Sequence, residues 1–169
     1  NIISIEPYFI NFARLLSNLK INKINTYNCI LAAASNEKGF NKFNIKQDPS
    51  YHSAGGKLSE EGKFNVSKIT IDSLKINKTI KGIKIDTEGH ELEVLKGAER
   101  IINQNKPDLI IEINKNCFDE CLTFLKTQEY KLYFFNEKEK KIVNIEKFDN
   151  DYLTIEGANC LATLKKITD

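Results

Sequence analysis

The chain has 169 residues, 41% of them hydrophobic and 28% charged, which is enough for one domain with a sizeable core. Its net charge of +2 excludes the strong basic field that attracts nucleic acid or an anionic membrane surface. No apolar run approaches the roughly 18 residues of a membrane span, and scattered cysteines without a signal-peptide pattern favour a cytoplasmic protein.

The N-terminal third predicts a strand, an acid and a helix, followed by more strands. Residues 2–5 favour a short strand ending at Glu6, and Pro7 suits the first turn of a helix with apolar residues at spacings of three and four. Residues 26–33 predict a second strand. Because the chain begins inside an apolar run at Asn1, we expect a single domain over residues 1–169 that is incomplete at its N-terminus.

The middle of the chain predicts two half-exposed strands and then a strand that leads into a helix. Residues 40–45 and 64–71 alternate apolar and polar side chains on either side of a loop at 47–62. Residues 83–86 form the next strand, with Lys84 and Asp86 on one face. Thr87 is a suitable N-cap, and Glu88 and Glu91 fall in the first turn of a continuous helix that must stop before Pro107.

The C-terminal part predicts a buried strand, an amphipathic helix and three more strands. Residues 109–113 include Glu112, residues 117–126 have helical periodicity, residues 130–135 and 142–145 suit a hairpin, and residues 159–166 form a last strand. Strands that alternate with helices predict an α/β fold with a mostly parallel sheet covered on both faces.

Three predicted strands carry an acid at their carboxyl ends: Glu6, Asp86 and Glu112. Ligands of open α/β sheets bind at this edge. Glu6 is either a solvated residue before a helix or an acceptor for ribose hydroxyls, and Asp86 is either half of an ion pair with Lys84 or a catalytic or metal-binding carboxylate. Glu88 and Glu91 fit capping as well as catalysis, and Glu112 remains open between these roles.

One long segment carries a family resemblance. The stretch "IKGIKIDTEGHELEVLKGAERIINQNKPDLIIEIN" resembles the signature of FkbM-family S-adenosylmethionine-dependent methyltransferases. The stretches "SIEPYFINFARLLSNLKIN", "ILAAASNEKG" and "NCLATLKK" look like the acidic second strand with its helix, the third strand and the last strand of the same family. The resemblance therefore covers nearly the whole chain.

The resemblance implies a class I methyltransferase fold. This is a Rossmann-like three-layer sandwich with strand order 3-2-1-4-5-7-6, in which the seventh strand is antiparallel. The glycine-rich turn and the first strand lie outside this sequence. A different Rossmann-type enzyme that binds a nicotinamide cofactor or a nucleotide sugar, and a non-catalytic binding domain, are the alternatives.

The resemblance also implies the parts of a site. Glu6 would hold the ribose of S-adenosylmethionine, and four further residues would flank or line the adenine: Pro7, Tyr8, Ala32 and Ala33. Asp86 would act as general base or, with Glu112, as ligand to a divalent ion such as magnesium, and Glu88 and Glu112 are further catalytic candidates. The acceptor would be a hydroxyl of a sugar, glycan or other small metabolite. It would be contacted by Glu91 and by loop residues Tyr51, His52 and Ser53.

Overall fold

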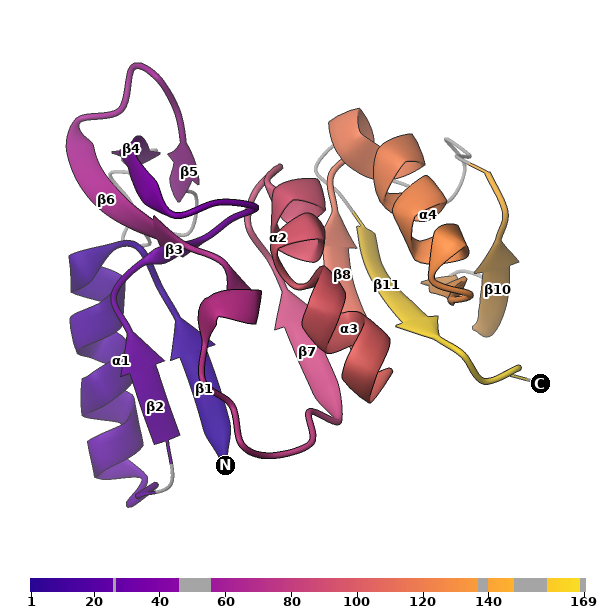
Figure 1. The fold of residues 1–169 in the computed structure, drawn as a ribbon, viewed down its shortest axis with the longest axis horizontal. Helices are drawn as coiled ribbons and strands as arrows, with labels where there is room; N and C mark the ends of the chain where they lie inside the picture. The colour runs from indigo at the N-terminus through magenta and orange to yellow at the C-terminus, as the bar shows by residue number, and fades with distance from the viewer. Residues whose placement is uncertain (26, 46–55, 137–139, 148–157, 168–169) are drawn as a thin grey trace. The chain divides into compact units, whose positions relative to one another are not determined.

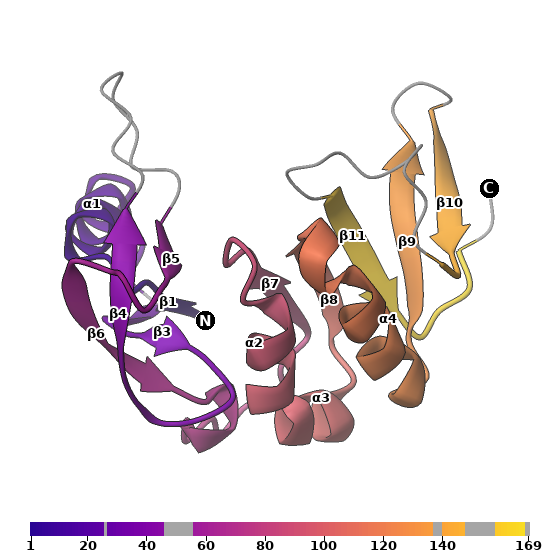
Figure 2. The ribbon, with the colours of Figure 1, turned by 90° about the horizontal axis from the view of Figure 1, so that it is seen from above.

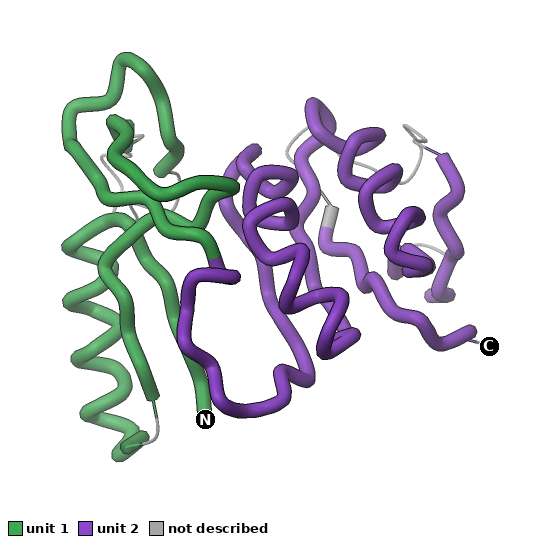
Figure 3. Tube along the Cα trace, viewed as in Figure 1, with its two compact units in different colours: residues 1–70 green, residues 71–169 purple. Residues whose placement is uncertain are grey.

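The computed structural model describes residues 1–25, 27–45, 56–136, 140–147 and 158–167, which Figure 1 shows as coloured ribbon. The chain divides into two compact units, Asn1–Thr70 (unit 1) and Ile71–Asp169 (unit 2), coloured separately in Figure 3. The single domain expected over residues 1–169 stays a prediction. Within the described ranges, no helix is both long enough and apolar enough to cross a membrane.

The start of unit 1 forms the predicted strand and helix. Strand β1 (Ile2–Ile5) pairs in parallel with β2 (Tyr27–Ile30), and α1 (Phe9–Ile21) connects them. The helix begins at Phe9 and not at Pro7, because the Glu6 carboxylate accepts the Tyr8 amide at 2.8 Å and Tyr8 stays extended. The strand expected over residues 26–33 is interrupted after Ile30, where the chain turns into a second sheet.

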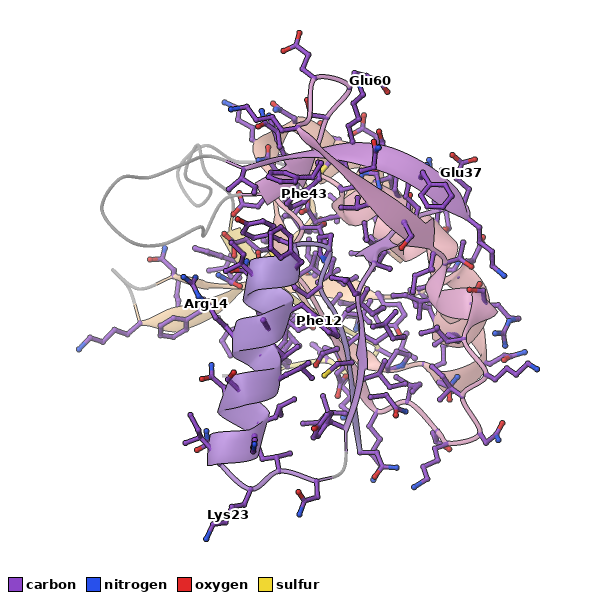
Figure 4. The ribbon with its side chains drawn as sticks, turned by 90° about the vertical axis from the view of Figure 1, so that its left-hand side faces the viewer. Phe12, Arg14, Lys23, Glu37, Phe43 and Glu60 are labelled. Atoms are coloured by element: carbon purple, nitrogen blue, oxygen red, sulfur yellow. The ribbon has the colours of Figure 1, made fainter. Side chains whose placement is uncertain are left out.

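The second sheet of unit 1 is built mostly from antiparallel strands. Its order is β3-β6-β4-β5, and its members are β3 (Ala33–Ala34), β4 (Gly39–Ile45), β5 (Gly56–Leu58) and β6 (Phe64–Ile69). Phe43, Ala33 and Val66 form its core, while Glu37 and Glu60 point away from it (Figure 4). Gly62 is required for close packing, since a Cβ there would lie 2.4 Å from the backbone nitrogen of Phe43.

Unit 2 contains a five-stranded sheet of order β10-β9-β11-β8-β7. Its strands are β7 (Gly82–Ile85), β8 (Asp108–Ile113), β9 (Lys131–Asn136), β10 (Lys141–Ile145) and β11 (Ala158–Thr163). The order β7-β8-β11-β9, with β11 antiparallel to its neighbours, is the 4-5-7-6 order that the resemblance implies. The sheets are nevertheless mixed and not mostly parallel, because the predicted β9–β10 hairpin and the β4–β6 pair are antiparallel.

The helices of unit 2 cover one face of its sheet. They are α2 (Glu91–Gly97), α3 (Glu99–Asn105) and α4 (Phe118–Thr127), and Figures 1 and 2 show all three on the same side. Leu109, Ile111 and Ile113 point to this side and are buried, whereas Ile110 on the opposite face is 49% exposed. Among the described residues of unit 2, no helix covers that opposite face, so the second helical layer of the expected sandwich is not seen there.

The helix expected to run without interruption to Pro107 is broken at Ala98. Ala98 is fully buried with non-helical backbone angles (φ −114°, ψ 6°), and α3 begins directly after it. Asp72, in the short 3-10 helix η1 (Ile71–Ser73), accepts the backbone amides of Arg100 at 2.8 Å and Ile101 at 2.9 Å. This distant carboxylate satisfies two of the amides that a helix start leaves unpaired. As predicted, the helix ends before Pro107.

Candidate functional site

The residues predicted to bind a cofactor lie together at the carboxyl ends of β1 and β2 in unit 1. Ile5 pairs with Ile30, and the next amide, that of Glu6, donates to the Ile30 carbonyl at 3.1 Å. Glu6 is therefore beside the turn that leads into Ala32 and Ala33. The parallel pairing of two short strands brings together residues that are 25 positions apart in sequence, such as Ile5 and Ile30.

The Glu6 carboxylate can accept hydrogen bonds from hydroxyl groups. Its carboxylate is half-buried and accepts the Tyr8 amide. Burial raises the pKa of Glu6, while the Tyr8 amide and the Asn11 side chain act in the opposite direction. A carboxylate at the end of a strand is the group that accepts ribose hydroxyls in nucleotide-binding α/β folds. The Glu6 carboxylate is therefore an acceptor of the kind that the ribose of a nucleoside cofactor would require.

The residues expected around an adenine are packed within unit 1. Tyr8 stacks on Phe43 with a 6.3 Å ring separation and contacts Phe9 and Phe64 at 5.2 Å and 6.1 Å. Ala32 and Ala33 are 2% and 5% exposed. These side chains build the local core, and their contact with an adenine, like that of Pro7, stays a prediction.

The predicted catalytic acids lie at the carboxyl ends of the neighbouring parallel strands β7 and β8 in unit 2. Ile85 pairs with Ile111, so the residues that follow each, Asp86 and Glu112, come next to each other at this edge. We call Asp86, Glu88 and Glu112 the acidic edge. Glu6 belongs to unit 1, so the expectation that all three strand-end acids share one edge stays a prediction.

Lys84 and Asp86 form the ion pair that the strand alternation suggested. The Lys84 Nζ lies 2.6 Å from Asp86 Oδ2, and the two side chains are 59% and 40% exposed. An exposed pair of this kind contributes only about 0–1 kcal/mol to stability, so the pair by itself gives no strong structural reason for Asp86. The carboxylate remains accessible to a ligand, and a catalytic role stays open.

The acidic edge is electrostatically coupled. Desolvation by burial raises the pKa of Glu112, and the negative charges of Asp86 and Glu88 raise it further, while Lys84 lowers it. Asp86, Glu88 and Lys84 therefore lie close enough for their charges to act on Glu112. Glu112 thus has a raised pKa and lies beside the ion-paired Asp86. Carboxyl groups with perturbed pKa values are often found at sites of proton transfer.

The raised pKa predicts a pH-dependent effect of Glu112→Gln. A folded-state pKa above 4.5 means that ionised Glu112 destabilises the folded protein, and that this penalty disappears as pH falls through that pKa. Glu112→Gln should therefore raise the melting temperature modestly at about pH 7, and the difference should vanish near pH 4. Thermal unfolding at both pH values measures this, with Glu120→Gln on the exposed side of α4 as control. A lower melting temperature at pH 7 would contradict it.

Glu91 occupies a different environment from the one predicted. Its side chain is 0% exposed, and its oxygens accept hydrogen bonds from Thr87, Gly89 and Cys117. A buried carboxylate with both oxygens engaged within the protein does not fit the expected contact with substrate. Thr87 is not an N-cap either, because α2 begins only at Glu91 and the Thr87 hydroxyl bonds to the Glu91 carboxylate. Sequence reasoning missed the contact with Cys117, for which the sequence holds no local signal.

Other predicted residues have no assigned place in the site. Tyr51, His52 and Ser53 fall in residues 46–55, outside the described ranges. In the part of the chain that the structure describes, no three His, Cys, Asp or Glu side chains gather as a metal site, so magnesium has no support there. A cavity of about 570 Å³ in unit 2 lies between residues 72–80 and α3, and no predicted site residue lines it.

Comparisons with known proteins identify relatives of this chain. The family model described as Methyltransferase FkbM domain matches residues 1–132, a range that includes Glu6 and the whole acidic edge. No curated protein matches. A solved structure that resembles the chain is the crystal structure of Methyltransferase FkbM from Methylobacillus flagellatus KT at 2.20 Å resolution, with a TM-score of 0.58 and 20% identity. The likeness covers 95% of this chain and 35% of that one, and it shows a shared fold.

Proposed function

This chain belongs to the FkbM methyltransferase family, and we propose that it transfers a methyl group from S-adenosylmethionine to a hydroxyl of a sugar, glycan or other small metabolite. The observation that carries the proposal is the family match over residues 1–132, because it includes both groups of strand-end acids. The chain spans about a third of the solved relative's length, so activity, substrate and partners are proposals for the whole protein.

The cofactor would bind at the carboxyl ends of β1 and β2. When bound, S-adenosylmethionine supplies a methyl group on a positively charged sulfur. Glu6 would accept hydrogen bonds from the ribose hydroxyls, with Pro7 and Tyr8 on one side of the adenine and Ala32 and Ala33 on the other. The half-buried Glu6 carboxylate, oriented by the Tyr8 amide, supports this role.

The acidic edge would prepare the acceptor. Asp86 would accept the proton of the acceptor hydroxyl, so that the hydroxyl oxygen could take the methyl group that bound S-adenosylmethionine would supply. Lys84, whose Nζ lies 2.6 Å from Asp86 Oδ2, would orient that carboxylate. Glu88 and Glu112 would face the acceptor, and Tyr51, His52 and Ser53 are proposed to help select it.

A titration with S-adenosylmethionine tests the proposal. We expect calorimetry to show binding to the wild-type protein, and Glu6→Ala to weaken it about 10- to 100-fold through loss of charge-assisted hydrogen bonds. Glu6→Gln, which keeps one acceptor oxygen, should have a smaller effect. Glu60→Ala, on an exposed turn of the same unit, should have none.

The same titration separates the alternative functions. Binding of NADH or a nucleotide sugar in place of S-adenosylmethionine would favour another Rossmann-type enzyme. No response to S-adenosylmethionine at about 1 mM, where even weak ligands bind, would contradict the methyltransferase proposal.

A further inference from the structure

Glu91 is a fully buried carboxylate that contacts two separate loops, and we infer that it is a positioning residue for the acidic edge. A positioning residue acts through other groups and touches neither substrate nor cofactor. Its catalytic meaning depends on the proposed methyl transfer, whereas its effect on the loops depends only on the hydrogen bonds of unit 2.

The first loop connects Asp86 to helix α2. Glu91 Oε1 accepts the Thr87 amide at 3.2 Å, the Thr87 hydroxyl at 2.9 Å and the Gly89 amide at 2.9 Å. Three donors thus converge on one oxygen, and hydrogen bonds to an ionised acceptor are roughly twice as strong as neutral ones. Asp86 and Glu88 are the residues on either side of Thr87, so their backbone positions follow from these bonds.

The backbone of this loop is strained. Glu88 has φ 56° and Gly89 has φ 102°. A non-glycine residue in the left-handed region costs about 1–3 kcal/mol and persists only where surrounding contacts maintain it. The hydrogen bonds from Thr87 and Gly89 to Glu91 enclose Glu88 on both sides. Glu91 therefore stabilises the conformation in which Glu88 is presented.

The second loop follows strand β8. Glu91 Oε2 accepts a hydrogen bond from Cys117 Sγ at 3.2 Å, and Cys117 is the last residue of η2 (Lys115–Cys117). This short helix comes directly after the strand that carries Glu112. One carboxylate consequently joins the segment after β7 to the segment after β8.

These contacts of the buried Glu91 carboxylate determine the backbone geometry around the acidic edge. The buried carboxylate holds Asp86 and Glu88 in one loop and links that loop to the segment beyond Glu112. Its negative charge also contributes to the raised pKa of Glu112. Catalytic groups require placement within fractions of an ångström, and a shift of about 1 Å lowers rates roughly 100-fold.

Two substitutions of similar size separate hydrogen bonding from packing at this position. Glu91→Gln keeps an acceptor oxygen for the loop and turns an amide toward Cys117, whereas Glu91→Leu fills the space and leaves the loop amides unpaired. We expect Glu91→Leu to speed amide hydrogen exchange across residues 86–90 and to lower turnover about 100-fold, with unchanged affinity for S-adenosylmethionine. Glu91→Gln should retain more of both properties.

Thr87→Val supplies a second test if Glu91→Leu fails to fold, because it removes only the hydroxyl donor from a half-buried position. It should accelerate exchange of the same peptide by a smaller amount. The inference would be overturned if Glu91→Gln and Glu91→Leu showed the same amide hydrogen exchange and the same turnover. It would also be overturned if Glu91→Leu left amide exchange across residues 86–90 unchanged. If Glu91→Leu does not fold, unchanged exchange in Thr87→Val would overturn it. A wild-type protein that does not bind S-adenosylmethionine would instead refute the proposed function, while the exchange data would still decide whether Glu91 holds the loop.

Discussion

Asp86→Asn is expected to lower methyl-transfer turnover by about 100- to 10,000-fold, the usual contribution of a general base. The amide has nearly the same shape as the carboxylate but does not take a proton at neutral pH. Asp86 is exposed and, within the described residues, pairs with an exposed lysine, so folding should change by about 1 kcal/mol at most. Turnover is measured as S-adenosylhomocysteine release with an acceptor found in a panel of sugar and polyketide hydroxyls, and cofactor affinity by calorimetry.

Lys84→Met is the matched control for this variant. It removes the same ion pair and keeps the Asp86 carboxylate. It therefore distinguishes the effect of losing the general base from the effect of losing the ion pair. We expect its turnover to fall less than that of Asp86→Asn. If the two variants lose turnover equally, or if Asp86→Asn retains full turnover, Asp86 is a structural residue and not the base.

Phe118→Ala is expected to destabilise unit 2 by about 3–5 kcal/mol, the range observed when a large aromatic side chain is removed from a packed core. Phe118 is the first residue of α4 and follows Cys117 directly. Its side chain is 1% exposed, and α4 packs against the sheet. Because proteins are stable by only about 5–15 kcal/mol, this loss is a large part of the total. Urea unfolding followed by circular dichroism measures it.

Phe135→Ala is the matched control for Phe118→Ala. Phe135 lies in the same unit but is 53% exposed on the face of the sheet opposite the helices. Its removal should cost about 1 kcal/mol or less, since little area is uncovered. A similar loss of stability in the two variants would contradict the assignment of Phe118 to the core.

The sequence predicted most elements because their signals are local. Alternation of side chains along β7 and the short apolar run of β8 predicted these strands, and the spacing of apolar residues predicted the helices. The places where prediction departed from the structure share one cause. The break at Ala98, for example, accompanies a cap from Asp72, which is 28 positions away from Arg100 in the chain. Periodicity reports which face of an element is apolar and says nothing about such distant partners.

The candidate site shows the same division. The sequence placed Asp86 and Glu112 at strand ends, and the parallel pairing of β7 with β8 made these residues neighbours. It did not distinguish Glu91 from Glu88, since both acids precede or begin the same helix and fit its first turn equally well. The structure separates them, because Glu91 is buried and Glu88 is exposed.

By itself, the sequence determined the alternation of strands and helices, the acids that follow the strands and the family to which the chain belongs. Only the tertiary structure decided that the sheets are mixed, that Lys84 pairs with Asp86 and that Glu91 turns inward to bind Thr87, Gly89 and Cys117. The physical reason is that propensity and periodicity act over a few residues. Burial and hydrogen bonding depend on which distant segments the folded chain brings into contact.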